Sequence, residues 1–500
     1  MKKQLGALCL VAVFAMSPPP AVHAGSDSVS LTLKEAIRLA AENNLDVRAE
    51  MYTPAQDEAD IQRNQAIYDP IFSAAAAFSD TTAGSTALFG PDPIRGQSWQ
   101  LSSEISQLFQ SGAVASLGFD TGLFTNNSQS LINNYWQSSL GVSVRQPLLK
   151  NFGRENTEAG ITISRLVKSA SLERFTYRLL TTVAKVRSEY FTLYSLREQR
   201  EVRKVSLALA QKILAETKTR VAAGVLPAME ILNAEYGVAT REKELLEAER
   251  QVLDQSDTLG VLIQFHGQGE IEPVDEPRHA PLEVDAEQAI KQALAAPVVR
   301  AQKKILEINK LQSRIYDNKT KPDLSLVASN TMGGLDANYG RDLEKVGSLG
   351  YPTWGVGLNL SYPLGNGAAE NDYRRSLLKS EQTSLQIRGL EEQLANEVKA
   401  AIRAMETGIK QIAVAERGIA YAEERLNSFI RKSEVGIATT KEVLEVENDL
   451  ALARSNRISA VVGHDLAITR LWEVTGELLE REKIEVDTNA VDDLYRKSAR

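Results

Sequence analysis

The chain has 500 residues, of which 65 are acidic and 57 basic, and its formal net charge is −8 at pH 7. This acidic balance argues against nucleic acid as a partner. The few His residues are widely separated, and the chain has no metal-ligand spacing, phosphate-binding loop or nucleophile elbow. The sequence therefore predicts no catalytic residues, no metal site, no cofactor, and a protein that is not an enzyme.

Residues 1–24 have the pattern of a secretory signal peptide. Two Lys residues precede an apolar run from Leu5 to Met16, and small residues before and at Ala24 suit cleavage after it. The apolar run is too short to span a bilayer. The only Cys, Cys9, lies within this segment, so the mature chain is expected to be free of Cys, which suits an oxidising exported compartment.

The rest of the chain reads as a tandem duplication. LTLKEAIRLAAENN, from Leu31, matches VDAEQAIKQALAAP, from Val284, and LGVSVRQPLLKN matches VGLNLSYPLGNG. A repeat of roughly 210 to 250 residues is too long for a solenoid and indicates two similar halves of one architecture. We expect a first half at 25–281, a second half at 282–480 and a polar C-terminal tail at 481–500.

Each half is expected to begin with a helix of about 33 residues and to continue with strands, at about 68–146 and about 322–362. From Trp354 to Tyr362 every even position is large and apolar. In the first half, Trp136, Leu140, Val142 and Val144 share one face, whereas Gln137, Ser139, Ser143 and Arg145 share the other. This alternation fits either a half-buried strand of a soluble sheet or a membrane strand, apolar toward lipid and polar toward a lumen.

The strand region of the first half is longer by 36 residues, because Pro70 and Pro147 are 77 positions apart whereas Pro322 and Pro363 are 41 apart. The excess includes a further hairpin that turns at Ser111-Gly112. We expect it to extend the hairpins beyond the membrane, although added strands are the alternative. Two strands in each half give about four per chain, too few to close a barrel, so a membrane protein would need several chains to share one. Three chains would give twelve strands and four would give sixteen, and the sequence does not choose between them.

Very long helices are predicted from Pro147 to Gly224 and from Pro363 to Gly436, each on the order of 100 Å at 1.5 Å per residue. The second carries a coiled-coil stripe of apolar side chains. The stripe comprises Leu390, Leu394, Val398, Ile402, Met405, Ile409, Ile412, Ile419 and Leu426.

Each long helix is followed by a returning helix, which ends at about Gln264 in the first half and about Glu480 in the second. In the first half a stretch rich in Gly, Pro and acids interrupts the return, and the helix resumes from about Ala286 to Asp317. We expect the helix from about Leu33 to Ala66 to complete the return of the second half. The interruption of the first returning helix and the polar tail from Arg481 are expected to form a belt around the middle of the long helices.

The two helix turns repeat one pattern. RVAAGVLPAMEILNAE, at 220–235, and KSEVGIATTKEVLEVEN, at 432–448, each place an acid six residues after a Gly. The Gly allows a helix to end in a left-handed turn, and its small apolar neighbours leave a shallow surface free for a partner. Thr439 and Glu442 also fit a capping box, which is a purely structural explanation of that acid.

These turns, LTLKEAIRLAAENN, QPLLKNFG and the ending LWEVTGELL together resemble the TolC-like outer membrane efflux protein family over essentially the whole mature chain. The resemblance implies a mainly α fold with β: a homotrimer whose long coiled-coil helices form an α-barrel joined to a shared 12-stranded transmembrane β-barrel. It implies a place in the outer membrane with a large periplasmic portion. The implied role is the passive exit duct of a tripartite efflux pump or a type I secretion system. Its partners would be a periplasmic adaptor protein and an inner membrane efflux transporter or secretion ATPase.

The resemblance also implies site residues. In a trimer, Glu442 and Glu445 would form two stacked rings of three acids each, at a constriction that favours cations. Glu230 would belong to the network that holds the tip closed. Where the best-known family member has a Tyr and an Arg in that network, this chain has Ser433 and Ala438, so a different set, such as Arg431, Lys432 or Lys441, must serve. The residues expected to meet the adaptor are Gly224, Val225, Leu226, Pro227, Gly436, Ile437 and Ala438. The alternative function is a periplasmic coiled-coil adaptor or scaffold without a membrane pore, against which the alternating strands argue.

Overall fold

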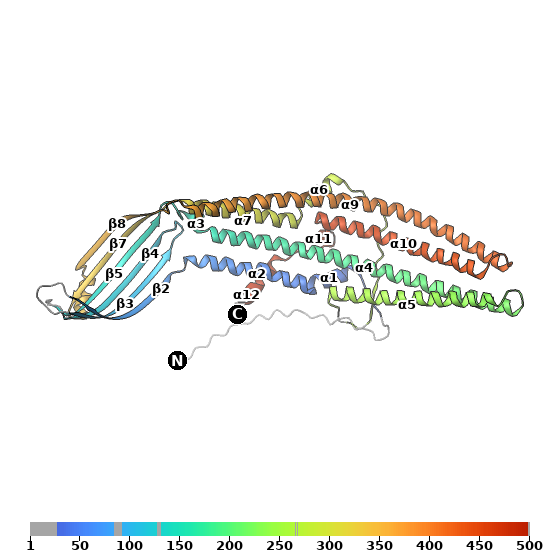
Figure 1. The fold of residues 1–500 in the computed structure, drawn as a ribbon, viewed down its shortest axis with the longest axis horizontal. Coiled ribbons are helices and arrows are strands. Elements are labelled where there is room, and N and C mark those ends of the chain that lie inside the picture. Colours follow the sequence, from blue (N-terminus) through green and yellow to red (C-terminus); the bar gives the residue numbers. More distant parts are fainter. Residues whose placement is uncertain (1–27, 85–92, 128–131, 266, 268, 499–500) are drawn as a thin grey trace, which may run out of the picture. The chain divides into compact units, whose positions relative to one another are not determined.

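The computed structural model describes residues 28–84, 93–127, 132–265, 267 and 269–498, and the predicted signal peptide lies outside them. The described chain is mainly helical and contains one large sheet (Figure 1). It divides into two compact units. Of the described residues, unit 1 holds those in 28–40, 186–278 and 411–462, and unit 2 holds those in 41–185, 279–410 and 463–498.

The sheet of unit 2 has six antiparallel strands in the order β2-β3-β4-β5-β7-β8. The prediction of about four strands per chain is therefore wrong. The strands are β2 (Ile71–Ala83), β3 (Ile94–Leu108), β4 (Val114–Asn126), β5 (Asn134–Pro147), β7 (Asp323–Asp336) and β8 (Tyr351–Ser361).

The extra 36 residues account for the difference. The hairpin turn at Ser111-Gly112 is confirmed, and Gly112 has the positive φ, +85°, that such a turn favours in Gly. The expectation that this hairpin lengthens its neighbours is wrong, because β3 and β4 pair side by side with β2 and β5 along their lengths. The cause is their two-residue alternation, which matches that of the flanking strands.

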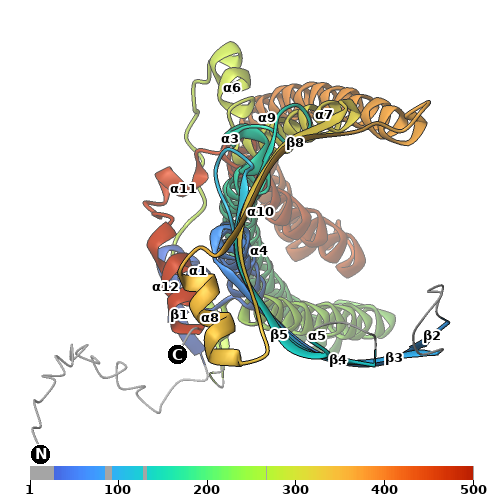
Figure 2. The same cartoon turned by 90° about the vertical axis from the view of Figure 1, so that its left-hand side faces the viewer.

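A short helix that the sequence analysis did not predict, α8 (Tyr339–Gly347), lies in the connection between β7 and β8. Asn338 caps it by accepting hydrogen bonds from the Gly340 and Arg341 N–H groups. The helix packs against β5 and β7 (Figure 2). Its Tyr339 ring lies 4.6 Å from the ring of Trp136, and Ser138 donates a hydrogen bond to Asp342.

The helix predicted to open each half is in fact two helices. In the first half, α1 (Leu33–Asn43) stops where Asn44 caps α2 (Leu45–Gln65) through the N–H groups of Asp46 and Val47. In the second half, α6 (Ala286–Ala293) is separated from α7 (Pro297–Thr320), which has Pro297 in its first turn. Both breaks follow from local residues that favour a new helix start.

The remaining elements of unit 2 are small. They are η1 (Ala66–Tyr68), α3 (Arg154–Thr157), α11 (Leu478–Arg481) and α12 (Thr488–Ser498). The polar tail thus contains a helix, α12, which packs against α2. Lys168 Nζ lies 2.8 Å from Glu58 Oε2 and 2.7 Å from Asp492 Oδ1, so one ammonium group joins the tail to two other helices.

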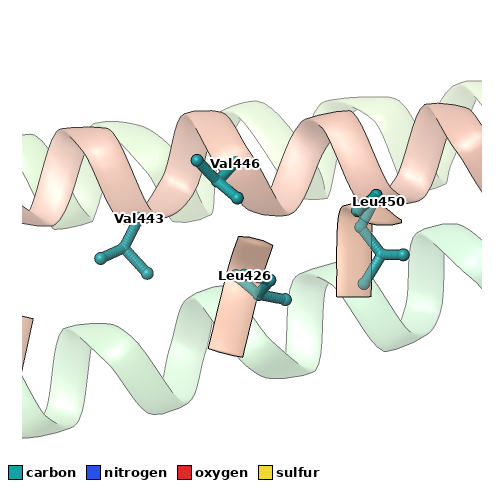
Figure 3. Close-up of a cluster of buried hydrophobic side chains, with 5 residues drawn as sticks. Leu426, Val443, Val446 and Leu450 are labelled. Carbon is teal, nitrogen blue, oxygen red and sulfur yellow. The ribbon is translucent and has the colours of Figure 1, made fainter. Parts of the chain in front are cut away.

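The long helices and their returns are confirmed as α4 (Ala159–Ala222), α5 (Met229–Ile263), α9 (Gly367–Glu434) and α10 (Thr440–Thr475). They begin later than their Pro residues, because the chain first turns through residues such as Gly153 and Asn366, which have positive φ. The predicted stripe on α9 is packing surface, with Leu394, Val398 and Met405 buried. In unit 1, Ala422 and Leu426 form a core with Val443, Val446 and Leu450 (Figure 3). Among the helices in the described part of the chain, none combines the length and the hydropathy that a membrane span requires.

The predicted break in the first return holds β6 (Glu270–Pro273), which pairs in parallel with β1 (Ser28–Leu31) in unit 1. Tyr190 fixes this pair from α4. Its hydroxyl donates to the Leu31 carbonyl at 2.8 Å and accepts from the N–H groups of Val274 and Asp275 at 2.9 and 3.0 Å. Burial raises the pKa of Tyr190 to about 12.

Candidate functional site: the two hairpin tips

The first tip joins α4 to α5 within unit 1. Gly224 has φ +74°, its N–H donates to the Val221 carbonyl at 2.9 Å, and the Val225 N–H donates to the Arg220 carbonyl at 2.9 Å. This pair of hydrogen bonds around a left-handed residue is the Schellman motif, which satisfies the last carbonyls of a helix. A Cβ at Gly224 would meet no atom within 4 Å, so the backbone conformation, and not crowding, calls for Gly.

The second tip, between α9 and α10, has the same backbone. Gly436 has φ +79°, its N–H donates to the Ser433 carbonyl at 3.1 Å, and the Ile437 N–H donates to the Lys432 carbonyl at 2.9 Å. Here too the space around the Gly is open. The predicted duplication of the turn is thus confirmed in its hydrogen bonds as well as in its sequence.

Most of the residues predicted to meet an adaptor are accessible. Val225 and Ile437 are 63% and 76% exposed, whereas Ala438 is buried. The accessible surface also includes apolar side chains beside the turns that the sequence analysis did not name. These are Met229, Leu232 and Val435, all more than 60% exposed. Each tip therefore presents apolar atoms to solvent around a bare Gly turn.

Glu442 closes a capping box, as its spacing predicts. Its Oε2 accepts from the Thr439 N–H at 2.7 Å and from the Thr439 hydroxyl at 2.9 Å, while the Glu442 N–H donates to Thr439 Oγ1 at 3.3 Å. The hydrogen bond from the Thr439 backbone, followed by that from its hydroxyl, holds the pKa of Glu442 below its usual range. The Glu442 side chain is exposed.

Glu230 occupies the matching position in the first tip but binds differently. Three residues before it stands Pro227, which has neither a hydroxyl nor an N–H, so Glu230 cannot form a capping box. Its Oε2 instead accepts from the Thr440 N–H at 3.1 Å, at the start of α10. The first tip's acid therefore caps the second tip's returning helix.

Arg220 makes a second connection in the same direction. Its guanidinium donates to the Ser433 carbonyl at 2.8 Å and to the Glu434 carbonyl at 3.2 Å, at the C-terminal end of α9. A cation at this end is also favoured by the helix dipole. Lys432, at the matching position, stays on its own helix with its Nζ 4.9 Å from the centre of the Phe429 ring.

A buried ion pair joins the returning helices beyond the tips. Arg241 Nη2 on α5 lies 3.0 Å from Glu447 Oε2 on α10, and both side chains are at most a tenth exposed. The same Nη2 donates to the Leu444 carbonyl at 2.8 Å. The helices approach closely here, since a Cβ on Gly237 would lie 2.5 Å from Leu444 Cδ1. Sequence reasoning did not find this pair, whose members are 206 residues apart.

The basic residues proposed for the tip network do not join the tips in the described chain. Arg431 pairs with Glu424 at 3.4 Å on α9, and Lys441 pairs with Glu445 at 3.7 Å on α10. Glu445 also lines an open cavity of about 740 Å³ along α5 and α10, together with Tyr236 and Thr240. One chain does not bring Glu442 and Glu445 into a ring, which would need further copies.

The described residues hold no group of three or more His, Cys, Asp or Glu side chains that could bind a metal ion. The site thus consists of two apolar turns, two acids in capping positions and a set of polar links between neighbouring helices.

Comparison with known proteins gives consistent matches. The sequence profile described as outer membrane efflux protein matches residues 36–263 and 289–477, which follow the two halves of the duplication. The outer membrane efflux protein BepC of Brucella suis biovar 1 (strain 1330) is 23% identical over 345 residues, 68% of this chain and 72% of that protein.

Solved structures share the fold. The outer membrane protein VceC of Vibrio cholerae superposes with a TM-score of 0.65 at 17% identity, over 89% of this chain and 96% of that one. The CmeC outer membrane channel of Campylobacter jejuni gives a TM-score of 0.65 at 14% identity, over 92% and 90% of the two chains. At these identities the likeness concerns the fold alone.

Proposed function

Because the chain belongs to the outer membrane efflux protein family, we propose that it is an outer membrane conduit that serves a tripartite efflux pump or a type I secretion system. Substrates would pass through a water-filled interior without a dedicated binding pocket, and an inner membrane transporter or secretion ATPase would supply the energy. Membership in a channel family supports a role other than catalysis. The observation that carries the proposal is the two-faced sheet of unit 2.

One face of this sheet is apolar and accessible. On β8, Trp354, Val356, Leu358 and Leu360 are all more than 60% exposed, although large apolar side chains usually avoid water. Val142 and Val144 of β5 lie on the same face through their pairing with β7. A soluble domain would bury this surface, whereas a membrane strand directs it toward lipid.

Replacing Leu358 or Val142 with Arg should therefore impair assembly in the outer membrane, because a charge at mid-bilayer on the lipid face costs about 2 to 4 kcal/mol. Asn359 and Ser143, one position along each strand, provide matched controls on the opposite face and should accept Arg. An equal response of both faces, measured as the yield of assembled protein in outer membrane fractions, contradicts the membrane assignment.

We propose that three chains share one transmembrane β-barrel. Most of the helical part of the protein would lie in the periplasm. The twelve strands implied by the family resemblance assume four strands per chain, whereas the sheet of this chain has six. The two edges of the sheet, β2 and β8, support sharing, because each presents unpaired backbone groups along an accessible strand.

The tips are proposed to bind the periplasmic adaptor. Gly224→Trp or Gly436→Trp should leave an assembled protein that no longer supports export, since bulk on the turn would displace the partner. Gly224→Asn is the matched control, because Asn accepts a left-handed conformation without much bulk, and it should retain most activity. Normal export by both Trp variants at wild-type protein level would rule out the tips as the docking site.

Glu442 and Glu445 are proposed to line a constriction in three copies, where anionic rings favour cations. Gln retains a capping box, so Glu442→Gln with Glu445→Gln removes charge and preserves the turn. The reversal potential under a salt gradient in a planar bilayer should shift toward lower cation selectivity. The same change at Glu235 and Glu247 is the control. If the acids only cap and support helices, the double variant will give an unshifted reversal potential.

The alternative, a periplasmic adaptor or scaffold without a pore, accounts for the helices but not for the exposed apolar sheet. Cell fractionation separates the two functions. The conduit is expected as a heat-modifiable oligomer in outer membrane fractions, whereas a scaffold would appear in the soluble periplasmic fraction.

A further inference from the structure

The strand pair β3–β4 is placed in the interior of the sheet, between β2 and β5. Its turn lies at the end of the sheet from which the helices continue, since the Gly153 N–H, just before α3, donates to the Ser111 carbonyl at 3.0 Å. A hairpin that only extended its neighbours beyond the membrane would turn at the opposite end. β3 and β4 therefore run the full height of the sheet, as β2 and β5 do.

The pair also carries the same two faces. Residues directly opposite each other in antiparallel strands point to the same side, so the register assigns each side chain to a face. The face of Val142 carries the apolar residues Trp99, Leu101, Ile105, Leu117, Phe119 and Leu123, and also the polar residues Gln97, Ser103, Gln107, Thr121 and Thr125. The face of Ser143 carries Ser98, Gln100, Ser102, Glu104, Ser116 and Asp120, with Phe124, Leu108 and Val114 toward the strand ends.

Two cross-strand rows of apolar side chains continue from β2 through the pair to β5. Ile105 is opposite Phe72 on one side and Leu117 on the other, and Leu117 is opposite Val142. A second row joins Phe78, Trp99, Leu123 and Trp136, and the rings of Phe78 and Trp99 lie 4.7 Å apart. The apolar face therefore passes from β2 to β5 through β3 and β4.

The curvature of the sheet agrees with this assignment. In Figure 2 the sheet is curved, and α8 lies against its convex side. Because α8 contacts Trp136 and Ser138, the apolar face is the convex one. Thr121 and Ser138, two of the polar residues of β4 and β5 on this face, are hydrogen-bonded to each other at 2.7 Å and are buried.

We propose that β3 and β4 cross the lipid with the other four strands, so that three chains build a wall of eighteen strands instead of twelve. With 15 and 13 residues, both strands exceed the roughly 9 to 11 residues needed to span a bilayer. Barrel diameter grows about linearly with strand number, so the exit would be about 1.5 times as wide as one of twelve strands. Its polar lining suits wide, hydrated cargo. This inference rests on the membrane location under the proposed function.

Nitroxide labels on single Cys residues in a Cys9→Ala background test it in the full chain, reconstituted in lipid. The pairs are Leu101→Cys with Ser102→Cys on β3 and Leu117→Cys with Ser116→Cys on β4. Val142→Cys with Ser143→Cys and Leu358→Cys with Asn359→Cys are the reference pairs on β5 and β8. Labels at 101 and 117 should collide with oxygen several-fold more, relative to a water-soluble nickel chelate, than labels at 102 and 116.

The outcomes separate the two proposals. If the reference pairs alternate but positions 101 and 117 are as open to the nickel chelate as 102 and 116, then β3 and β4 lie outside the membrane and the inference is wrong. If the reference pairs do not alternate either, the membrane location itself fails. Electron cryo-microscopy of the protein in nanodiscs gives an independent count: eighteen strands support the inference, and twelve overturn it.

Discussion

The two hairpin tips share one backbone turn but differ in where their charged side chains bind. In the second tip, Glu442 caps its own helix through Thr439, whereas in the first tip Pro227 prevents this and Glu230 reaches the Thr440 N–H. The Arg220 side chain, on α4, likewise donates hydrogen bonds to carbonyls at the end of α9. The two tips thus share the turn, and one residue difference, Pro227 at the position that matches Thr439, excludes the local cap in the first tip, where Glu230 binds the second tip instead.

This comparison makes the second tip dependent on the first. Both ends of the second tip, the C-terminus of α9 and the N-terminus of α10, receive a charged group from the first tip, while no equivalent group is returned among the contacts described. We therefore expect changes in the first tip to loosen the second, and changes in the second to remain local.

The largest effect is expected at the ion pair that joins the returning helices. Arg241→Met leaves the buried Glu447 carboxylate without its partner and should lower the local opening free energy of α5 and α10 by about 3 to 5 kcal/mol. Hydrogen–deuterium exchange of these helices measures it. The double variant Arg241→Met with Glu447→Leu should recover most of the loss, because it buries no unpaired charge. Unchanged protection in the single variant would show that the pair does not hold the helices together.

Arg220→Ala should have the next largest effect. It removes hydrogen bonds from a charged donor to two carbonyls, each worth about 1.5 to 3 kcal/mol, part of which water recovers because the site is partly open. Exchange should increase at the end of α9 and not in α4. Lys432→Ala, the matched control, should change the second tip much less. Equal effects of the two variants would mean that the link from Arg220 contributes nothing beyond an ordinary surface cation.

Glu230→Ala should cost about 1 kcal/mol, as loss of a side-chain cap does, and the cost should appear in the first turn of α10. Pro227→Thr sharpens the comparison, since it places a Thr in the first tip at the position that matches Thr439 in the second. Glu230 should then cap α5, and the Thr440 amide should exchange faster although Glu230 is still present. If the Thr440 amide stays protected in both variants, the cap across the tips is absent.

The smallest effect is expected from pH. The pKa of Glu442 is lowered by hydrogen bonds from Thr439, so ionisation of this carboxyl stabilises the second tip. A lowered folded-state pKa means that this stabilisation is present above the usual carboxyl pKa and is lost as the pH falls through the folded value. Protection factors at the Thr439 amide should fall on acidification, and Glu442→Gln should remove this dependence. The first tip has no such box and should not show it.

Much of the fold could be predicted because its signals are local. The apolar stripe, the Gly turns and the acids six residues later depend only on nearby residues, and these helices and turns lie where they were expected. Asn44 and Pro297 also indicate new helix starts. However, the apolar periodicity continues on both sides of them, so it predicts one long helix where the structure has two. The predicted strand count was wrong because local alternation, as at Trp99, Leu101 and Ile105, indicates a strand but does not determine whether it extends a neighbouring hairpin or pairs within the same sheet.

The links at the site could not be predicted from the sequence in this way. Arg241 and Glu447 are charged residues on helices rich in charge, and only the packing of α5 against α10 selects this pair and buries it. Arg220 resembles any basic residue in the last turn of a helix, and its contact with α9 depends on how the two tips lie together. The role of Glu230 was indicated only by Pro227, which excludes the local cap.

The mass of the native assembly tests the central claim, an outer membrane conduit built from several copies, most directly. The protein should be extracted from outer membranes in mild detergent and measured by native mass spectrometry after removal of lipid and detergent. We expect a single species with three copies of the chain that survives extraction. A single chain, recovered from the soluble periplasmic fraction, would contradict the account.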